Sequence, residues 1–340
     1  MQVTHEKIAS GFFVVPNLEE FFGEFRNQEN CLDIIGSFEF DNVARIYLAR
    51  VGALAITFLD EGHLRSIPKY RTRGSGAVPD YAMENHDRIV ELQERRMLFA
   101  NFIAAALFGH LSAIRRSALS GAQYVGMDEI VGFGRSGTTL VLESSAYTDD
   151  ALAPKVRLAQ RNPREVRIAT PTQIQEMIAF VAHLAERKAQ FEYADTASCM
   201  VMNYQAAILH SEQHSAASLA LNFVVAEALV NELFAAYGLV RDRPPKSFAN
   251  RSHTVTRYSN GRFRELSFAS KILALRDGGL IDWYLHQRLD EARRQRNDLM
   301  HGADRISVSQ SGTLQTAVRD LWAYLLDRPF ELCAGWSMRM

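Results

Sequence analysis

The stretch RRQRNDLMHG, residues 293–302, decides how the C-terminal half of this chain is interpreted. It stands at the end of a helix predicted over residues 280–301, and Gly302 follows His301 at the position where a left-handed residue stops a helix. Asn297 and His301 are four positions apart and share one helical face, whereas Arg296 lies about 140° round from His301. A guanidinium, an amide and an imidazole together suit the binding and cleavage of phosphodiesters.

The sequence on both sides of this motif predicts an almost wholly helical region. Thr170 followed by Pro171 indicates a helix start, because a capping residue and a proline in the first turn are typical of that position. Apolar residues then recur at helical spacing. Further helices are expected over residues 194–210, 215–237, 266–276, 280–301 and 314–326.

The N-terminal half has a different character. Phe38–Phe40 and residues 53–59 predict strands, residues 87–116 a long helix, and residues 124–147 a hairpin. The run 153–167 carries Lys155 and four arginines and is interpreted as a basic linker. We therefore expect a mainly α protein with an N-terminal mixed α/β or mainly helical domain over 1–168 and a helical domain over 169–340, its core at about 195–330.

Composition limits the class of protein. The chain has 340 residues, 47% hydrophobic and 23% charged, with a net charge of −1, which excludes a uniformly basic nucleic-acid coat. Three distant cysteines and the lack of a signal-like N-terminus favour a cytoplasmic location. The apolar run Leu98–Ile114 is short for a membrane span and contains Asn101 and His110. We expect a buried core helix there and no membrane association.

The pattern Arg296-Asn297-x-x-x-His301 at a helix end, with an apolar helix carrying a glutamate before it and an apolar helix after it, resembles the HEPN superfamily. Members are small helical bundles, and many are metal-independent endoribonucleases of toxin, abortive-infection and phage-defence systems. The resemblance covers about residues 195–330, and the layout of the whole chain is similar to the Apea-like branch. It implies that Arg296 and His301 form the catalytic pair, with Asn297 as a supporting polar residue. It also implies RNA as the substrate, a homodimer in which two motif helices meet, an antitoxin or phage-derived partner, and no cofactor or metal.

Glu227 is an acidic residue of the preceding helix and takes the corresponding place in the resemblance. Residues 219–233 are almost all apolar or small, which predicts a helix buried on every side. A buried carboxylate is costly unless it is paired. Arg296 is therefore the expected partner of Glu227, with a rim position or another arginine as the alternatives.

The segment 241–264 is rich in arginine and aromatic residues between the Glu227 helix and the Arg296 helix. Arginine forks bind phosphate and aromatic faces stack on unpaired bases, so single-stranded RNA is one expected ligand. A solvated crossover between two helices is the alternative. The candidate RNA-binding residues are Arg251, Arg257, Tyr258, Arg262 and Arg264.

Two weaker motifs favour ordinary structural roles. Gly132-x-Gly134-x-x-Gly137 matches a dinucleotide-binding pattern, but a strand-like run follows it where a helix is required, which indicates a hairpin turn. His210 and His214 have the one-turn spacing of a zinc pair, with His183 as a conceivable third ligand. The metalloprotease glutamate is absent between them, so a helix end is the favoured interpretation.

The sequence thus predicts an endoribonuclease in which a ribose 2′-hydroxyl attacks the adjacent phosphorus. Two alternatives remain: a non-catalytic RNA- or nucleotide-binding module that mediates dimerisation and sensing, and a scaffold protein in which residues 296–302 form an ordinary helix end.

Overall fold

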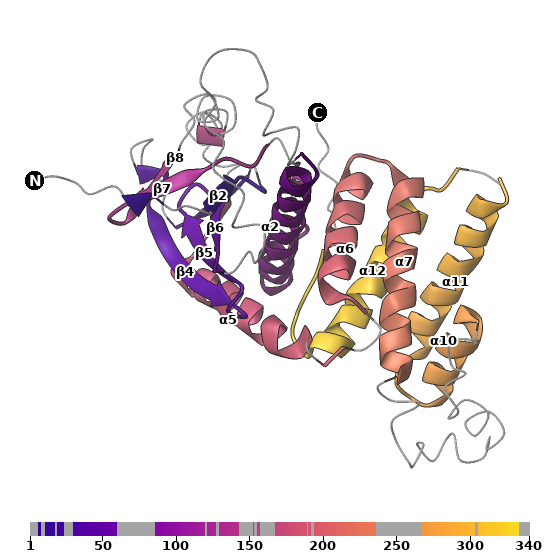
Figure 1. The fold of residues 1–340 in the computed structure, drawn as a ribbon. Helices are drawn as coiled ribbons and strands as arrows, with labels where there is room; N and C mark the ends of the chain where they lie inside the picture. Colours follow the sequence, from indigo (N-terminus) through magenta and orange to yellow (C-terminus); the bar gives the residue numbers. More distant parts are fainter. Residues whose placement is uncertain are drawn as a thin grey trace, which may run out of the picture. The chain divides into compact units, whose positions relative to one another are not determined.

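The structure, a computed structural model, describes residues 6–7, 11–17, 19–23, 30–59, 86–119, 121–126, 129–142, 152, 155–156, 167–188, 190–191, 194–235, 267–302 and 305–332. The chain divides into two compact units, whose elements are labelled in Figure 1. Unit 1 comprises Met1–Ala104 and Gly121–Ala185, and unit 2 comprises Ala105–Ser120 and Glu186–Met340. The division differs from the expected boundary at residue 168, because most of helix α5 (Pro171–Lys188) belongs to unit 1.

An antiparallel four-stranded sheet lies at the centre of unit 1. Its strands follow the order β2 (Gly11–Val14), β6 (Ala53–Phe58), β5 (Ala44–Ala49) and β4 (Ile34–Phe40). The two expected strands are β4 and β6, whereas β2 and β5 were not expected. Both are buried along almost their whole length and so lack the polar and apolar alternation that marks a strand with one exposed face.

Aromatic side chains cover one face of this sheet. Phe99 and Phe102 of helix α2 (His86–Arg115) lie with ring centroids 5.9 and 5.4 Å from that of Phe40. Phe99 also lies 5.1 Å from Phe58. Edge and tilted ring pairs of this kind are favourable. The first part of the expected long helix thus buries its apolar side against the sheet.

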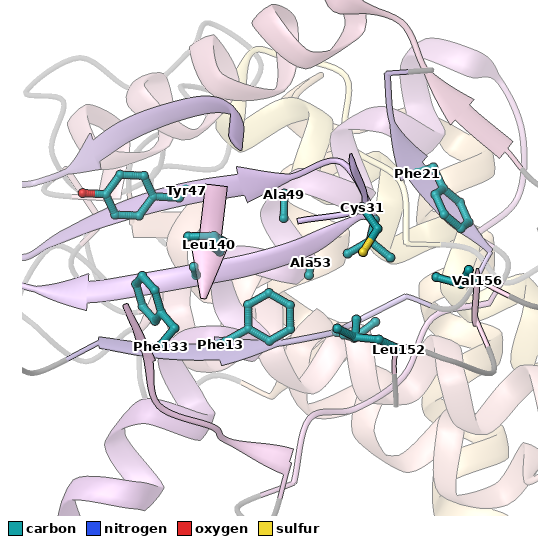
Figure 2. Packing of buried hydrophobic residues seen from close by; sticks show 13 residues of the cluster. Phe13, Phe21, Cys31, Tyr47, Ala49, Ala53, Phe133, Leu140, Leu152 and Val156 are labelled. Atoms are coloured by element: carbon teal, nitrogen blue, oxygen red, sulfur yellow. The ribbon is translucent and has the colours of Figure 1, made fainter. Parts of the chain in front are cut away.

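A second hydrophobic cluster covers the opposite face (Figure 2). Strands β7 (Phe133–Ser136) and β8 (Thr139–Leu142) form a hairpin, and Phe133 lies 6.3 Å from the ring of Tyr47. Phe13 and Leu140 belong to the same cluster. The expected hairpin is therefore present, and it closes the core of unit 1.

Short strands complete unit 1. β1 (Glu6–Lys7) pairs with β7, and β3 (Glu20–Phe22) pairs in parallel with β9 (Arg167–Ala169). Arg167, the last residue of the expected linker, thus belongs to a strand.

Lys155 also departs from the linker interpretation, because it is buried. Its Nζ donates hydrogen bonds to the backbone carbonyls of Asn17 and Glu20 and lies 4.7 Å from the ring centroid of Phe21. Burial lowers the pKa of Lys155 to about 7, although the Glu20 carboxylate opposes this shift. The prediction of a solvated basic linker is wrong at Lys155, which is part of the core.

Unit 2 is a helical bundle, and the described chain as a whole is mainly α. Helix α7 packs against the other four helices of the bundle (Figure 1). Side chains of Asp195, Ser267, Asp282 and Ser307 cap four of the helix starts by accepting backbone N–H groups. The bundle helices are α6 (Thr196–Ser211), α7 (Ser215–Phe234), α10 (Phe268–Asp277), α11 (Trp283–Met300) and α12 (Val308–Leu326).

These helices agree with the expected ones except at the start of α12. That helix begins at Val308 rather than Leu314, because Ser307 and Gln310 form a reciprocal capping box. The serines and Gly312 that follow have low helix propensity and are not apolar. A search for apolar residues at helical spacing therefore misses the first turns of α12.

Two buried polar networks join α6, α7 and α12. Every side chain in them is at most 5% exposed, so each hydrogen bond satisfies a group that water does not reach. In the first network, Ser311 Oγ donates to Ser218 Oγ (2.9 Å) and lies 3.1 Å from His210 Nδ1. In the second, Trp322 Nε1 donates to Asn203 Oδ1 (3.2 Å), and Asn203 Nδ2 donates to Asn222 Oδ1 (2.8 Å).

Two helices within the described residues are long and apolar enough to cross a membrane, Val90–Arg115 and Ser215–Phe234. Most of each apolar window is buried inside the structure, as in the core helix of a globular protein. In the first helix, the Asn101 amide exchanges hydrogen bonds with the backbone of Val125, and His110 Nδ1 lies 2.8 Å from the Pro329 carbonyl oxygen. Both polar groups of the expected core helix are therefore satisfied.

Candidate functional site

The motif occupies the C-terminal end of α11, where the sequence placed it. Met300 is the last helical residue and His301 is the C-cap, with its backbone N–H donating to the carbonyl of Asn297 at 3.0 Å. Gly302 has a φ of +78°, so the expected left-handed stop is confirmed. The His301 side chain is exposed beyond the last turn. An imidazole in this position can reach a ligand without any rearrangement of the helix.

Arg296 is held in place from two directions. Its Cζ lies 5.2 Å from the centroid of the Phe223 ring on α7, and its Nη1 donates to Asn297 Oδ1 at 3.2 Å. Phe223 is itself buried and packs against Phe268, with ring centroids 5.1 Å apart. A guanidinium stacked on an aromatic ring keeps its edge N–H groups available for a planar acceptor. Phe223 was not foreseen as part of the site, because only the packing of α7 on α11 shows its contact.

The four arginines of α11 differ in their partners. Arg288 pairs with Asp320 at 2.6 Å, and Arg293 and Arg294 both pair with Asp290, at 2.9 and 2.7 Å. Among the residues that the structure describes, no carboxylate lies within ion-pair distance of Arg296. Arg293 and Arg294 share one carboxylate, whereas Arg296 has none among the described residues, which makes it the arginine best suited to an anion.

Asn297 serves Arg296 rather than His301 in this arrangement. Its side-chain oxygen accepts the Arg296 hydrogen bond, while its backbone carbonyl accepts the N–H of His301. The His301 imidazole makes no hydrogen bond within the described parts of the chain. The expected supporting role of Asn297 thus takes the form of a contact that orients the guanidinium.

The expectation that Glu227 is buried beside Arg296 is wrong. Glu227 is exposed, and no ion pair joins these two described residues. Its charge acts on Lys271 of α10, whose pKa is lowered by burial while Glu227 opposes the shift. Lys271 Nζ also donates to Asn231 Oδ1 at 2.6 Å. The charge of Glu227 thus acts on α10, and Glu227 forms no ion pair with Arg296.

The reason for this error lies in the composition of α7. Positions 217, 220, 224 and 227 form one exposed stripe along the helix, with Val224 half exposed. Small and apolar residues precede Glu227 on that stripe and make it resemble the buried faces. The buried carboxylate of α7 is Glu232, which is 4% exposed and accepts the backbone N–H of Ala194 at 3.0 Å.

The candidate RNA-binding residues Arg251, Arg257, Tyr258, Arg262 and Arg264 lie outside the described residues. Their contribution to a site therefore stays a prediction from sequence.

The glycine motif and the histidine pair have the structural roles expected of them. The glycine motif runs through the β7–β8 hairpin, where Gly137 occupies the two-residue turn with a φ of +62°. His210 is buried against Ser311, whereas His214 is exposed before α7. No group of three or more histidines, cysteines, aspartates or glutamates converges within the described ranges.

The two described cysteines are buried and offer no reactive thiolate. Burial raises the pKa of Cys31, and it raises that of Cys199 to about 12, with Asp195 and Glu232 adding to the second shift.

Comparisons of the chain with protein-family models, with curated proteins and with solved structures give no match. The chemistry of the site therefore has to be argued from its own residues. These residues offer one fixed, uncompensated guanidinium and one exposed imidazole, five positions apart at the end of a single helix.

Proposed function

We propose that unit 2 is a HEPN-type, metal-independent endoribonuclease domain, with Arg296 and His301 as its catalytic residues. The observation that carries this proposal is the state of Arg296, which alone among the arginines of α11 has no carboxylate partner within the described residues. The protein holds it on Phe223 and Asn297 instead, which orients a positive charge without neutralising it. The order of the helices around the motif, with α7 before it and α12 after it, also supports the HEPN assignment.

The reaction uses the nucleophile that RNA itself supplies. The 2′-oxygen attacks the adjacent phosphorus, the bond from phosphorus to the 5′-oxygen breaks, and the products are a 2′,3′-cyclic phosphate and a free 5′-hydroxyl. Arg296 stabilises the charge that develops on the phosphoryl oxygens. His301 removes the 2′-hydroxyl proton or gives a proton to the leaving 5′-oxygen.

One histidine per chain cannot act as acid and base in the same step. A two-fold homodimer that brings two α11 ends together would supply both groups, and two-fold symmetry is the commonest arrangement of homo-oligomers. We include this dimer in the proposal, together with a cytoplasmic setting in toxin or phage-defence systems and control by an antitoxin or phage-derived partner.

The test is cleavage of mixed-sequence single-stranded RNA by the full-length protein in EDTA, beside Arg296→Ala and His301→Ala. Wild type should release fragments with 2′,3′-cyclic phosphate ends, identified by mass spectrometry, and should leave an all-deoxy oligonucleotide intact. Both variants should lose cleavage while remaining folded, because neither residue has an ion pair within the described residues, and Arg296→Ala removes only the stack on Phe223 and one hydrogen bond. Equal cleavage by wild type and both variants would contradict the proposal.

The exposure of Glu227 favours a second candidate, an RNA-binding module without catalysis. Glu227 is exposed and forms no ion pair with Arg296, so among the described residues no carboxylate is paired with the motif arginine. This alternative predicts salt-dependent RNA binding that His301→Ala leaves unchanged, with no product under any condition tested.

A further inference from the structure

A pocket of about 320 Å³ lies at the end of α11 opposite the motif. It opens between the first turn of α11 and the last turns of α12 in unit 2. Two carboxylates and one phenol supply its polar groups. Its lining residues are Asp282, Leu285, Asp320, Ala323 and Tyr324.

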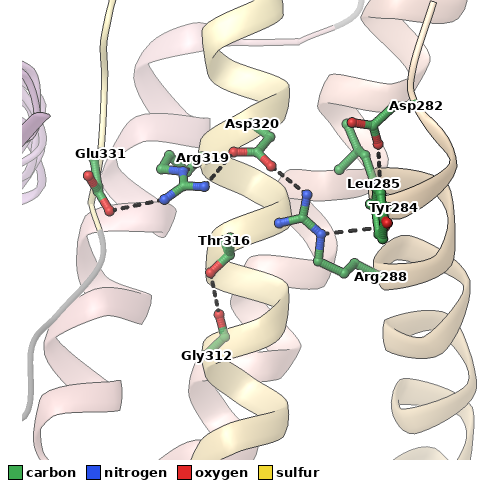
Figure 3. A network of polar contacts seen from close by, with 9 residues as sticks. All are labelled: Asp282, Tyr284, Leu285, Arg288, Gly312, Thr316, Arg319, Asp320 and Glu331. Atoms are coloured by element: carbon green, nitrogen blue, oxygen red, sulfur yellow. Dashed lines mark hydrogen bonds and ion pairs between the residues drawn. The ribbon is translucent and has the colours of Figure 1, made fainter.

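Arg288 and Arg319 fix one of the carboxylates, Asp320. Arg288 Nη2 donates to Asp320 Oδ2 at 2.6 Å, and Arg319 Nε donates to Asp320 Oδ1 at 2.9 Å. Arg319 also pairs with Glu331 at 3.5 Å, and Figure 3 shows these contacts as one chain from α11 across α12. The two arginines are thus already balanced by Asp320 and Glu331.

Asp282, the other carboxylate, keeps capacity for a ligand. Its Oδ1 accepts the backbone N–H of Leu285 at 2.6 Å and caps α11. Its Oδ2 has no hydrogen-bond partner within the described residues, and the residue is exposed. With two arginines matched by Asp320 and Glu331, the charge left over at the pocket is the negative charge of Asp282.

Aromatic side chains are exposed beside these carboxylates. Trp283 is 52% exposed, Tyr284 70% and Tyr324 46%, and the rings of Trp283 and Tyr284 meet edge to face with centroids 5.2 Å apart. Burial raises the pKa of Tyr324, and the charges of Asp282 and Asp320 raise it further. Tyr324 lines the same pocket as these two carboxylates. Exposed tryptophan and tyrosine side chains are typical of the energetic centres of protein interfaces.

We propose that this pocket binds an arginine or lysine side chain of a partner protein, with the apolar neighbours of that residue packing on Trp283 and Tyr284. A cation gains from the free oxygen of Asp282 and from the ring of Tyr324, the one aromatic residue among those that line the pocket. A nucleic acid is disfavoured, because its phosphates would approach the unbalanced negative charge of Asp282. The pocket lies at the far end of an 18-residue helix from His301, about 27 Å along the axis, so the partner site is separate from the proposed RNA site.

The test uses two blocked peptides of equal shape, acetyl-Leu-Arg-Leu-amide and the same peptide with citrulline, which lacks the positive charge. The full-length protein is labelled with 5-fluorotryptophan, and the ¹⁹F signal of Trp283 is assigned with Trp283→Phe. The arginine peptide should shift this signal in a saturable way. The citrulline peptide should bind about fivefold more weakly or not at all.

Two variants test whether the arginine peptide binds at this pocket. Asp282→Asn keeps a side-chain oxygen for the helix cap but removes the charge, and it should weaken arginine-peptide binding about fivefold. Asp298→Asn, an exposed position at the other end of α11, is the matched control and should change nothing. Equal affinity for the two peptides, indifference to Asp282→Asn, or no saturable shift would overturn the proposal. Displacement of the arginine peptide by oligouridylate would overturn it in favour of RNA.

Discussion

The two ends of α11 are built from similar residue types but have opposite electrostatic characters. At the C-terminal end, Arg296 has no acidic partner within the described residues and rests on the ring of Phe223. At the N-terminal end, Arg288 is matched by Asp320, and Asp282 is left with a free oxygen. The location of the acidic partners, more than the number of arginines, decides which end can attract an anion. The net charge of −1 for the whole chain does not reveal that the two ends of α11 differ in charge.

The largest expected effect is a loss of RNA cleavage that differs between two neighbouring arginines, Arg296 and Arg294. Arg296→Ala should reduce the rate of RNA cleavage by about 100-fold or more, the usual cost of losing a group that stabilises transition-state charge. Arg294→Ala removes a guanidinium that is ion-paired with Asp290, a carboxylate that it shares with Arg293, and should stay within about threefold of wild type. Single-turnover rates on one labelled RNA measure both. Losses of similar size would show that the partners of the arginines do not determine their roles.

The second prediction concerns the removal of a carboxylate, that of Asp290, which should make the C-terminal end of α11 more positive. Asp290 accepts hydrogen bonds from Arg293 Nε at 2.9 Å and Arg294 Nη2 at 2.7 Å. Asp290→Asn releases both guanidiniums, so RNA should bind about tenfold more tightly at low salt, and the slope of log K against log salt should steepen by roughly one to two. Fluorescence anisotropy across a salt series measures both quantities. An unchanged slope would show that these arginines do not contact RNA.

The third prediction concerns the acidic end. Asp320→Asn weakens the contacts with Arg288 and Arg319, whose side chains are 24% and 37% exposed. The free energy of unfolding should fall by about 1 kcal/mol, because these ion pairs are partly screened by solvent. Urea unfolding measures the loss. Asp298→Asn is the control, and it should leave the midpoint unchanged because Asp298 has no ion pair within the described residues.

The smallest expected effect is a pH dependence of the free energy of unfolding, caused by Asp290. Burial would raise the pKa of Asp290, but the hydrogen bonds and charges of Arg293 and Arg294 outweigh it and lower the pKa below 3.8. The stabilisation is therefore complete above the unfolded value of 3.8 and is lost as the pH falls through the lower folded value. Wild type should exceed Asp290→Asn in stability at pH 6, and the difference should disappear near pH 2. A constant difference would contradict this assignment.

The sequence predicted the helices of unit 2 well, because caps and apolar spacing act within a few residues of each other. Gly302 has the left-handed conformation that its position after the motif indicates. The same local logic placed the motif at a helix end and recognised the β7–β8 turn.

Contacts between distant segments could not be predicted in this way. The stack of Arg296 on Phe223 depends on how α7 packs against α11. Glu227 looked buried because its exposed stripe carries small and apolar side chains, and Lys155 looked solvated because its neighbours are basic. In each case the neighbouring residues in the sequence indicated one degree of burial, and the packing of distant segments produced the opposite one.

The two buried polar networks restrict how α6, α7 and α12 can move. If α12 shifted by one turn against its neighbours, Ser311 and Trp322 would lose their acceptors in an environment without water, and each stranded group would cost about 1–3 kcal/mol. Sliding is therefore strongly penalised, and these three helices behave as one block. A conformational change that moves α12 must therefore move α6 and α7 with it. These three helices form a rigid support against which α11 packs.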